Sequence, residues 1–166
     1  MFYEDILREF NRNNIQFVVV GGVAFNLLGG IRATQDLDLL ILMDDDNITR
    51  IIEILQKNNY KPRQPVNPKD FTNRNIREKW IQDKNMKAFS FFKDYQSYEQ
   101  VDIIIDSPVD FENARKDAKV IEIDDLMIPV ISVANLIKMK ERAGRDIDKL
   151  DIKDLKMIME MQNEKR

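Results

Sequence analysis

Two aspartates separated by a single residue, Asp36 and Asp38, are the side chains of this sequence best suited to chemistry. They stand in the run QDLDLLI, and side chains along a strand alternate between its two faces. Both carboxylates therefore point the same way, while Leu37 and Leu39 point into the core. Two like charges on one face of an apolar strand repel each other, and a cation between them relieves the repulsion. A strand end at the surface, with both acids solvated, is the alternative interpretation.

A third acid, Asp102, interrupts another apolar strand, VDIII. If the two strands lie side by side, the three carboxylates converge. Three acids around two magnesium ions about 3.5–4 Å apart form the arrangement for in-line phosphoryl or nucleotidyl transfer. Asp102 would then orient or deprotonate the attacking hydroxyl. The sequence has no His and no Cys, so metal ligands must be oxygens, which favours Mg²⁺ or Mn²⁺ as the cofactor.

A pair of glycines, Gly21 and Gly22, ends the apolar run QFVVV and precedes a short predicted helix. Glycine lets a phosphate approach the backbone closely, and the start of a helix offers free N–H groups. The pair is therefore a candidate anion site. Strand-turn-helix junctions also use glycine for geometry alone, so this signal gains its meaning from the acids that follow.

The whole stretch VVVGGVAFNLLGGIRATQDLDLLI resembles the DNA polymerase β-like nucleotidyltransferase superfamily. Thirteen residues separate Gly22 from the acid-hydrophobic-acid-hydrophobic run, and a later strand bears Asp102. The approach Arg-x-Thr-x-Asp-x-Asp and the tail LIKMKERAGRDIDKLDIKDL are similar to those of small bacterial nucleotidyltransferases that include relatives of AbiEii-type toxins. The resemblance covers residues 16–42, 99–106 and 130–155.

The resemblance implies a nucleotidyltransferase fold, a mixed β-sheet flanked by helices, and transfer of a nucleoside monophosphate from an NTP (an EC 2.7.7-type reaction). It carries the metal role onto Asp36, Asp38 and Asp102. One departure is Gly22, because many members have Ser there and its hydroxyl is missing. The positions expected to bind nucleotide are Gly21, Gly22, Arg32, Thr34, Lys140 and Arg145. For Lys140 and Arg145, a purely solvated side chain is an equally weighted alternative.

The remaining acids have structural interpretations. Asp106 lies about 13 Å along its strand from Asp102, too far to share a metal. The run at 44–46 precedes a helix, as a cluster at a helix start does. Asp148 and Asp151 also fit a helix start, so capping is their predicted role.

Charge is unevenly distributed along the chain. The net charge is −3, yet residues 61–93 carry nine Lys and Arg against three Asp and Glu. This basic segment faces an anionic ligand such as an RNA end, or it is a solvated face; both hypotheses stay open. Within it, Trp80, Phe91 and Phe92 either stack on a base or pack in the core or a hairpin, which is the commoner fate of aromatic rings.

Length and patterning predict one α/β (α+β) domain over residues 1–166. A catalytic core at about 14–130 precedes C-terminal helices at about 131–162. No apolar run is long enough to span a bilayer and no signal peptide is recognisable, so we expect a cytoplasmic protein without a membrane partner. Strands are expected near 16–22, 37–43, 87–93, 100–106, 119–123 and 127–131, and helices near 4–13, 23–28, 48–55, 69–84, 111–116, 133–142 and from 146 onward.

Three hypotheses of function follow. The first is an active nucleotidyltransferase acting on RNA, a protein hydroxyl or a small molecule, with a toxin–antitoxin or defence setting implied by the resemblance. The second is a non-catalytic module of the same fold that binds nucleotide or grips a partner, such as a cognate toxin or antitoxin. The third is a generic α/β domain with coincidental acids. The presence of all three acids favours the first.

Overall fold

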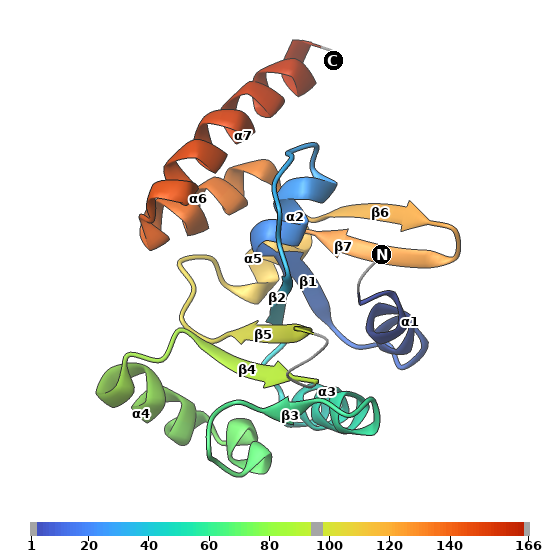
Figure 1. Cartoon of the computed structure of the whole chain (residues 1–166), viewed down its shortest axis with the longest axis vertical. Helices are drawn as coiled ribbons and strands as arrows, with labels where there is room; N and C mark the ends of the chain where they lie inside the picture. The colour runs from blue at the N-terminus through green and yellow to red at the C-terminus, as the bar shows by residue number, and fades with distance from the viewer. Residues whose placement is uncertain (1–2, 94–97, 165–166) are drawn as a thin grey trace.

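The structure is a computed structural model that describes residues 3–93 and 98–164. Its centre is a seven-stranded sheet in the order β3-β4-β5-β2-β1-β7-β6 (Figure 1). The pairs β1–β7 and β2–β5 are parallel and the others antiparallel. The strands are Phe17–Val20 (β1), Asp36–Ile41 (β2), Lys61–Pro62 (β3), Ala88–Phe92 (β4), Gln100–Ile104 (β5), Lys119–Ile123 (β6) and Leu126–Val130 (β7).

Helices surround this mixed sheet and confirm the predicted fold class (Figure 1). The long C-terminal pair, α6 and α7, lies side by side at one end of the molecule, and α3 and α4 lie at the other. No helix in the described part of the chain is long and apolar enough to cross a membrane. The helices are Glu4–Arg12 (α1), Gly21–Leu27 (α2), Asp45–Lys57 (α3), Arg74–Lys84 (α4), Phe111–Lys116 (α5), Val133–Ala143 (α6) and Asp146–Glu164 (α7), with a 3₁₀ turn at Pro68–Thr72.

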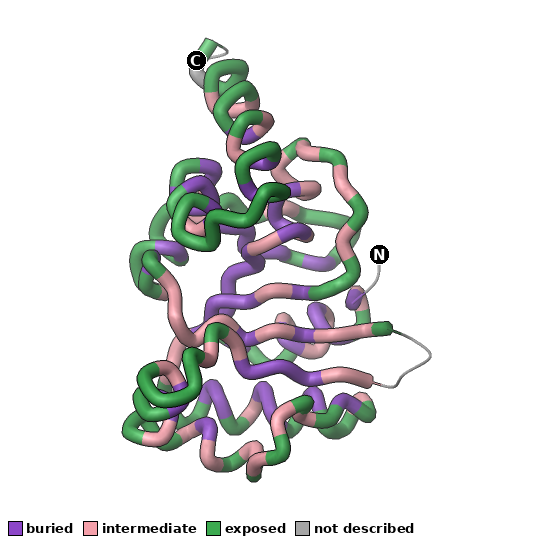
Figure 2. Tube along the Cα trace, turned by 60° about the vertical axis from the view of Figure 1, so that its left-hand side comes forward, coloured by how far each residue is buried: buried purple, intermediate pink, exposed green. Residues whose placement is uncertain are grey.

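The strands β1 and β2, which lead into the glycine turn and carry two of the three acids, are central because their sequences are apolar on more than one face. All four residues of β1 are buried, and so are Leu37, Leu39, Leu40 and Ile41 of β2. A strand covered on both faces reads as a continuous apolar run, as these do. Figure 2 shows buried positions along the strands in the middle of the molecule and exposed ones on the outer turns of α7.

One buried amide fixes where these two strands begin and end. The Asn47 side chain accepts a hydrogen bond from the backbone N–H of Gln16 (2.9 Å) and donates to the carbonyls of Gln16 (3.0 Å) and Leu42 (2.9 Å). Asp44 caps α3 by accepting from the Asn47 N–H (2.7 Å), which confirms the predicted helix-start role of the 44–46 run. The start of β1, the end of β2 and the start of α3 are thereby tied together.

A second packing centre supports β4. The rings of Phe71 and Trp80 stack on Phe89, with centroid separations of 4.8 Å and 5.4 Å. Trp80 is 5% exposed, so its predicted core role is confirmed. Residues around the 3₁₀ turn and α4 are thereby anchored to the sheet.

Replacing Trp80 with Ala should lower the free energy of unfolding by about 3–5 kcal/mol, because a large buried ring leaves a cavity. Urea denaturation monitored by far-UV circular dichroism measures the change. Ile31→Ala serves as the control, since Ile31 is 95% exposed and its loss should change little. A loss below about 1 kcal/mol for Trp80→Ala would show that the stack is not a packing centre.

Candidate functional site

The three acids lie on one face of the sheet at its centre. In the parallel β2–β5 pair, Asp38 is the register partner of Asp102, and Asp36 is the partner of Gln100. Because side chains alternate along each strand, these four side chains share a face. Leu37 and Leu39 point to the opposite face and are fully buried. The sheet therefore brings together the acids that the sequence singled out.

The turn after β1 lies against the same acids. Val20 is the register partner of Asp38 in the β1–β2 pair, and α2 begins at the next residue. Gly21 has a φ of +67°, and a Cβ there would stand 1.9 Å from Asp38 Oδ2. The backbone N–H of Gly22 donates a hydrogen bond to the Asp38 carboxylate. Glycine at 21 is thus required by both backbone conformation and space.

The missing hydroxyl at position 22 has a physical reason. A Cβ on Gly22 would stand 2.4 Å from Thr34 Oγ1 and 3.4 Å from an Arg32 guanidinium nitrogen. The loop that approaches β2 fills the space that a side chain at 22 would need. The Thr34 hydroxyl therefore lies where this turn would otherwise present a side chain of its own.

Electrostatic repulsion is concentrated on Asp38. Burial, followed by the negative charges of Asp102 and Asp36, raises the pKa of Asp38 to about 7, and the Gly22 N–H opposes the rise. Burial and Asp102 also raise the pKa of Asp36, and Arg63 opposes that rise. The site carries more negative charge than its surroundings balance, which is the condition that a bound cation relieves.

The third carboxylate is held by its neighbour on β5. The Gln100 side-chain amide donates to both oxygens of Asp102, each at 3.0 Å, and Arg63 Nη2 donates to Gln100 Oε1 at 2.5 Å. As the side chains stand, no three acids within residues 3–93 and 98–164 are grouped tightly enough to enclose a metal ion. Gln100 was missed from the sequence, although its spacing of two from Asp102 places it on the same face.

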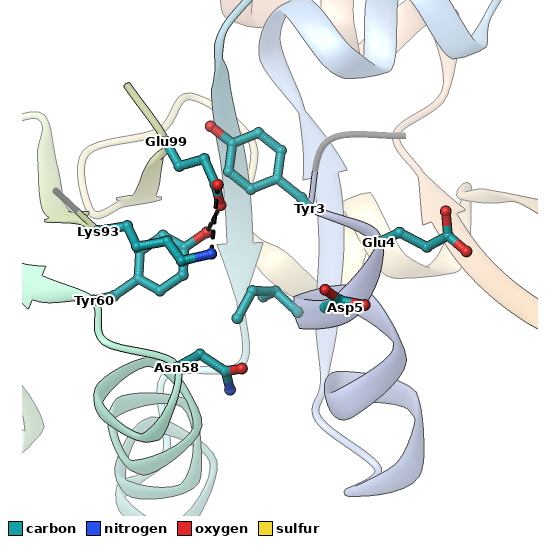
Figure 3. A pocket seen from close by; sticks show the side chains of 8 residues that line it. Tyr3, Glu4, Asp5, Asn58, Tyr60, Lys93 and Glu99 are labelled. Carbon is teal, nitrogen blue, oxygen red and sulfur yellow. Dashed lines mark hydrogen bonds and ion pairs between the residues drawn. The ribbon is translucent and has the colours of Figure 1, made fainter. Parts of the chain in front are cut away.

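A tyrosine from the N-terminal helix region clasps the two acid-bearing strands. The Tyr3 hydroxyl donates to the carbonyl of Gln35 and accepts from the backbone N–H of Gln100 (2.9 Å). Burial raises its pKa to about 12. Figure 3 shows the cavity beneath it, where Tyr60 and Lys93 both meet Glu99. These polar groups pair with one another, so the side chains that line the cavity support the strands.

A cavity of about 420 Å³ adjoins Asp38 and Gly21 and extends beneath α6. Asp106 at its edge is paired with Lys87 (2.5 Å) and Arg142 (2.7 Å), which accords with its predicted structural role. Four cations and a mostly apolar wall are suited to a triphosphate followed by a base. The cations are Lys87, Lys140, Arg142 and Arg145, and the wall is formed by Ile104, Pro108, Leu136 and Met139.

A buried ion-pair network joins the C-terminal helices to the loop before β2. Asp151 accepts from Arg32 Nη1 and Lys140 Nζ, both at 2.6 Å. Asp148 accepts from Arg145 Nε at 2.7 Å and lies 3.6 Å from Lys140 Nζ. Asp148 also accepts from the Arg145 backbone N–H, so it caps α7 as predicted. The capping prediction for Asp151 is wrong, because its carboxylate is 4% exposed and satisfies two cations.

The same network shows how the expected nucleotide-binding cations are placed. Arg32 and Lys140 are held by Asp151, and the Lys140 side chain is 5% exposed. The Arg145 side chain is 67% exposed, lines the cavity and senses the charge of Asp38. Arg145 is therefore the most exposed cation of the set, although its guanidinium is bound to Asp148, while Arg32 and Lys140 set the local potential.

The basic segment is not a uniform surface. Arg77 is 9% exposed and donates to the carbonyls of Phe71 (2.6 Å) and Thr72 (2.7 Å), so it closes the 3₁₀ turn. Arg63 lines a third cavity, of about 610 Å³, together with Asp36, Phe92 and Gln100. Part of the segment's charge is thus structural, and part of it faces the acids.

The sheet, the acids on its central strands and the glycine turn together form a nucleotidyltransferase fold, and comparison with known proteins agrees. The model of the family "Nucleotidyltransferase of unknown function (DUF6036)" matches residues 3–86, and the chain belongs to this family. No curated protein matches the sequence.

Solved structures with the same fold include two antibiotic-modifying enzymes. The lincosamide antibiotic adenylyltransferase LnuA, crystallised with lincomycin, is 19% identical with a TM-score of 0.61, over 93% of this chain and 94% of that one. ANT(2")-Ia in complex with adenylyl-2"-tobramycin is 12% identical with a TM-score of 0.55, over 96% and 94%.

A third solved structure is an antigenic nucleotidyltransferase-like protein from Paracoccidioides brasiliensis. It is 15% identical with a TM-score of 0.56, over 95% of this chain and 73% of that one. At these identities the likeness confirms the predicted nucleotidyltransferase fold. The resemblance to AbiEii-type relatives stays a prediction.

Gly21→Ala should abolish nucleotide binding, because the added methyl group displaces the Asp38 carboxylate in addition to straining the backbone. Gly144→Ala is the matched control: Gly144 also has a φ of +67°, yet the nearest atom to an added Cβ is 3.8 Å away. Both variants should lose about 1–2 kcal/mol of stability from the left-handed conformation. If Gly144→Ala impairs nucleotide binding as severely as Gly21→Ala, the clash with Asp38 is not the cause.

Stability in the presence of a chelator should fall with rising pH because of Asp38. Because the pKa of Asp38 is raised in the folded state, protonated Asp38 adds to the free energy of unfolding. This contribution is fully present below about pH 4 and is lost as the pH rises through about 7. From about pH 5 to about pH 8, the wild type should lose on the order of 2 kcal/mol relative to Asp38→Asn, since one pKa unit is worth about 1.4 kcal/mol. Urea unfolding at both pH values measures this difference, and parallel behaviour of the two proteins would contradict the raised pKa.

Proposed function

We propose that this protein transfers a nucleoside monophosphate from an NTP to a hydroxyl acceptor in a reaction that depends on a divalent cation. The observation that carries the proposal is the placement of Asp36, Asp38 and Asp102 on one sheet face beside the Gly21 turn. This face lies between two cavities, one reaching Asp38 and the other reaching Asp36. Two substrates approaching from opposite sides would meet at the carboxylates.

The residues fit Mg²⁺ or Mn²⁺. All three candidate ligands are carboxylates, and hard divalent cations prefer oxygen. Burial, and after it the charges of Asp102 and Asp36, raise the pKa of Asp38, and a bound cation would favour the charged carboxylate. Asp36, Asp38 and Asp102 would hold the metal once Asp102 exchanges its hydrogen bonds with Gln100. When bound, the metal would supply charge neutralisation of the triphosphate and a lower pKa for the attacking hydroxyl.

The protein's own groups divide the remaining work. The cavity beside Asp38 would hold the NTP, with Arg145 and Arg142 against the phosphates and the aliphatic wall against the base. Asp102 would accept the proton of the acceptor hydroxyl, because the chain has no His and a carboxylate is the available base. The hydroxyl oxygen then bonds to the α-phosphorus, and pyrophosphate leaves. Gly22 and Thr34 line the turn against which the phosphates would rest.

The biological setting is part of the same proposal. The Arg-x-Thr-x-Asp-x-Asp approach and the tail at 130–155 support a cytoplasmic toxin–antitoxin or defence protein, with a cognate partner protein. The structural neighbours adenylylate antibiotics, so a small-molecule acceptor is equally compatible with the fold. A modification assay against an unfractionated cell extract separates these settings by the size of the labelled product.

A thermal shift assay with each NTP tests the nucleotide site directly. A ligand at a hundred times its dissociation constant adds about 2.7 kcal/mol of stability, which moves the melting point of a domain of this size by several degrees. The wild type should shift with Mg²⁺ and an NTP together. Asp36→Asn combined with Asp38→Asn should lose the shift and any pyrophosphate release.

A control double variant, Asp83→Asn with Asp124→Asn, changes charge equally at two exposed positions outside the site and should behave as the wild type. Asn is also tolerated at the left-handed position 124. A Mg²⁺-dependent shift that survives in the Asp36/Asp38 variant would remove the metal assignment. The absence of a shift with every NTP would favour the non-catalytic alternative, a module that grips a partner protein.

A further inference from the structure

The cavity beside Asp36 differs in chemistry from the one beside Asp38. Its volume, about 610 Å³, lies in the range of sites for small molecules. Among its described lining residues, Arg63 is the sole cation, against the acids Asp36 and Glu99. Glu99 is itself engaged by Tyr60 (2.5 Å) and Lys93 (3.4 Å). The cavity is therefore close to charge balance, whereas the other carries four cations against three acids.

This charge balance argues against a nucleic-acid strand as the occupant. Proteins that bind single strands line the path of the backbone with Lys and Arg. Arg63, the cation at hand, already donates to Gln100 and lies 5.9 Å from the centroid of the Phe92 ring. Pro62 and Pro65 form another part of the wall and offer no N–H to a phosphate.

The walls instead match a ring that bears hydroxyl groups. The ring of Phe92, with the Arg63 guanidinium above it, forms an apolar part of the wall, and the carboxamides of Gln35 and Gln100 each provide both donors and acceptors. A hydroxyl is likewise a donor and an acceptor, so carboxamides pair with polyols without requiring a charge. Arg63 adds further donors above the ring.

Gln100 links this cavity to the chemistry. Its Nε2 donates to both oxygens of Asp102, and its Oε1 is held by Arg63. A hydroxyl entering from this cavity would replace one Gln100 contact to Asp102 and stand beside the carboxylate that takes its proton. The oxygen would then bond to the α-phosphorus as pyrophosphate leaves, so the transfer is balanced without any further reactant.

The geometry points to this cavity as the acceptor site and to an uncharged, sugar-like polyol as the acceptor class. The inference rests on the proposed nucleotidyl transfer, because it names the second substrate of the same site. Phe92 and Gln100 determine specificity: the ring supports the polyol, and the amide aligns its hydroxyl with Asp102.

Saturation-transfer NMR with a panel of methyl glycosides of common hexoses and pentoses tests this inference, without any NTP. The wild type should bind at least one glycoside. Phe92→Leu and Gln100→Leu should each weaken that binding about tenfold, as the loss of one aromatic or polar contact does. Gln56→Ala, at an exposed position on α3, is the matched control and should bind as the wild type.

A three-nucleotide RNA, lincomycin and tobramycin complete the panel. Binding of the RNA that depends on Phe92 and Arg63 would overturn the inference in favour of an RNA acceptor, and binding of tobramycin alone would show that the site selects cations. The absence of a saturation-transfer signal from every glycoside would also overturn it, and so would glycoside binding that both leucine variants retain. The thermal shift with NTP and Mg²⁺ is independent of the acceptor, so its persistence separates failure of this inference from failure of the proposed function.

Discussion

The structure depends on the parallel pairing of β2 with β5, which sets Asp38 directly opposite Asp102. Neighbouring strands lie about 4.8 Å apart, so two carboxylates in register are forced to share a small volume at the sheet centre. This arrangement is costly for the metal-free protein, since burial and then the charges of Asp102 and Asp36 raise the pKa of Asp38. A protein keeps such repulsion where a cation or a reaction uses it.

Neighbouring groups keep the acids in place despite that repulsion. The Gly22 N–H bonds Asp38, the Gln100 amide bonds Asp102, and the Tyr3 hydroxyl joins the strands that carry them. Asn47 fixes the far ends of β1 and β2. The site is therefore held by polar contacts from both sides, and these contacts favour one arrangement of the strands.

The C-terminal helices complete one side of this site. Asp148 and Asp151 draw Lys140, Arg145 and Arg32 together in a cluster of three cations and two carboxylates, which leaves an excess of positive charge beside the Gly21 turn. The cavity that reaches Asp36, lined in part by β3 and β4, has no such excess of positive charge. The two sides of the acid triad thus differ in potential, and such a difference assigns the polyanionic substrate to one side and leaves the other for the acceptor.

The sequence alone determined most of the strands and helices and the acids, because alternation, apolar runs and caps are local signals. It did not predict the two-residue strand β3, and the helix expected near 69–84 is a 3₁₀ turn followed by α4. The QDLDLLI run predicted a central strand with two carboxylates on one face, and the acidic run at 44–46 predicted the start of α3, where Asp44 accepts from the Asn47 N–H. The tertiary structure decided which groups meet. Only the β2–β5 register brings Asp102 to Asp38, and only the fold of α7 brings Asp151 to Arg32, since these contacts join positions far apart in the chain. The role of Gly22 was likewise a matter of space, because the obstacle to a side chain there is Thr34, from the loop that leads into β2.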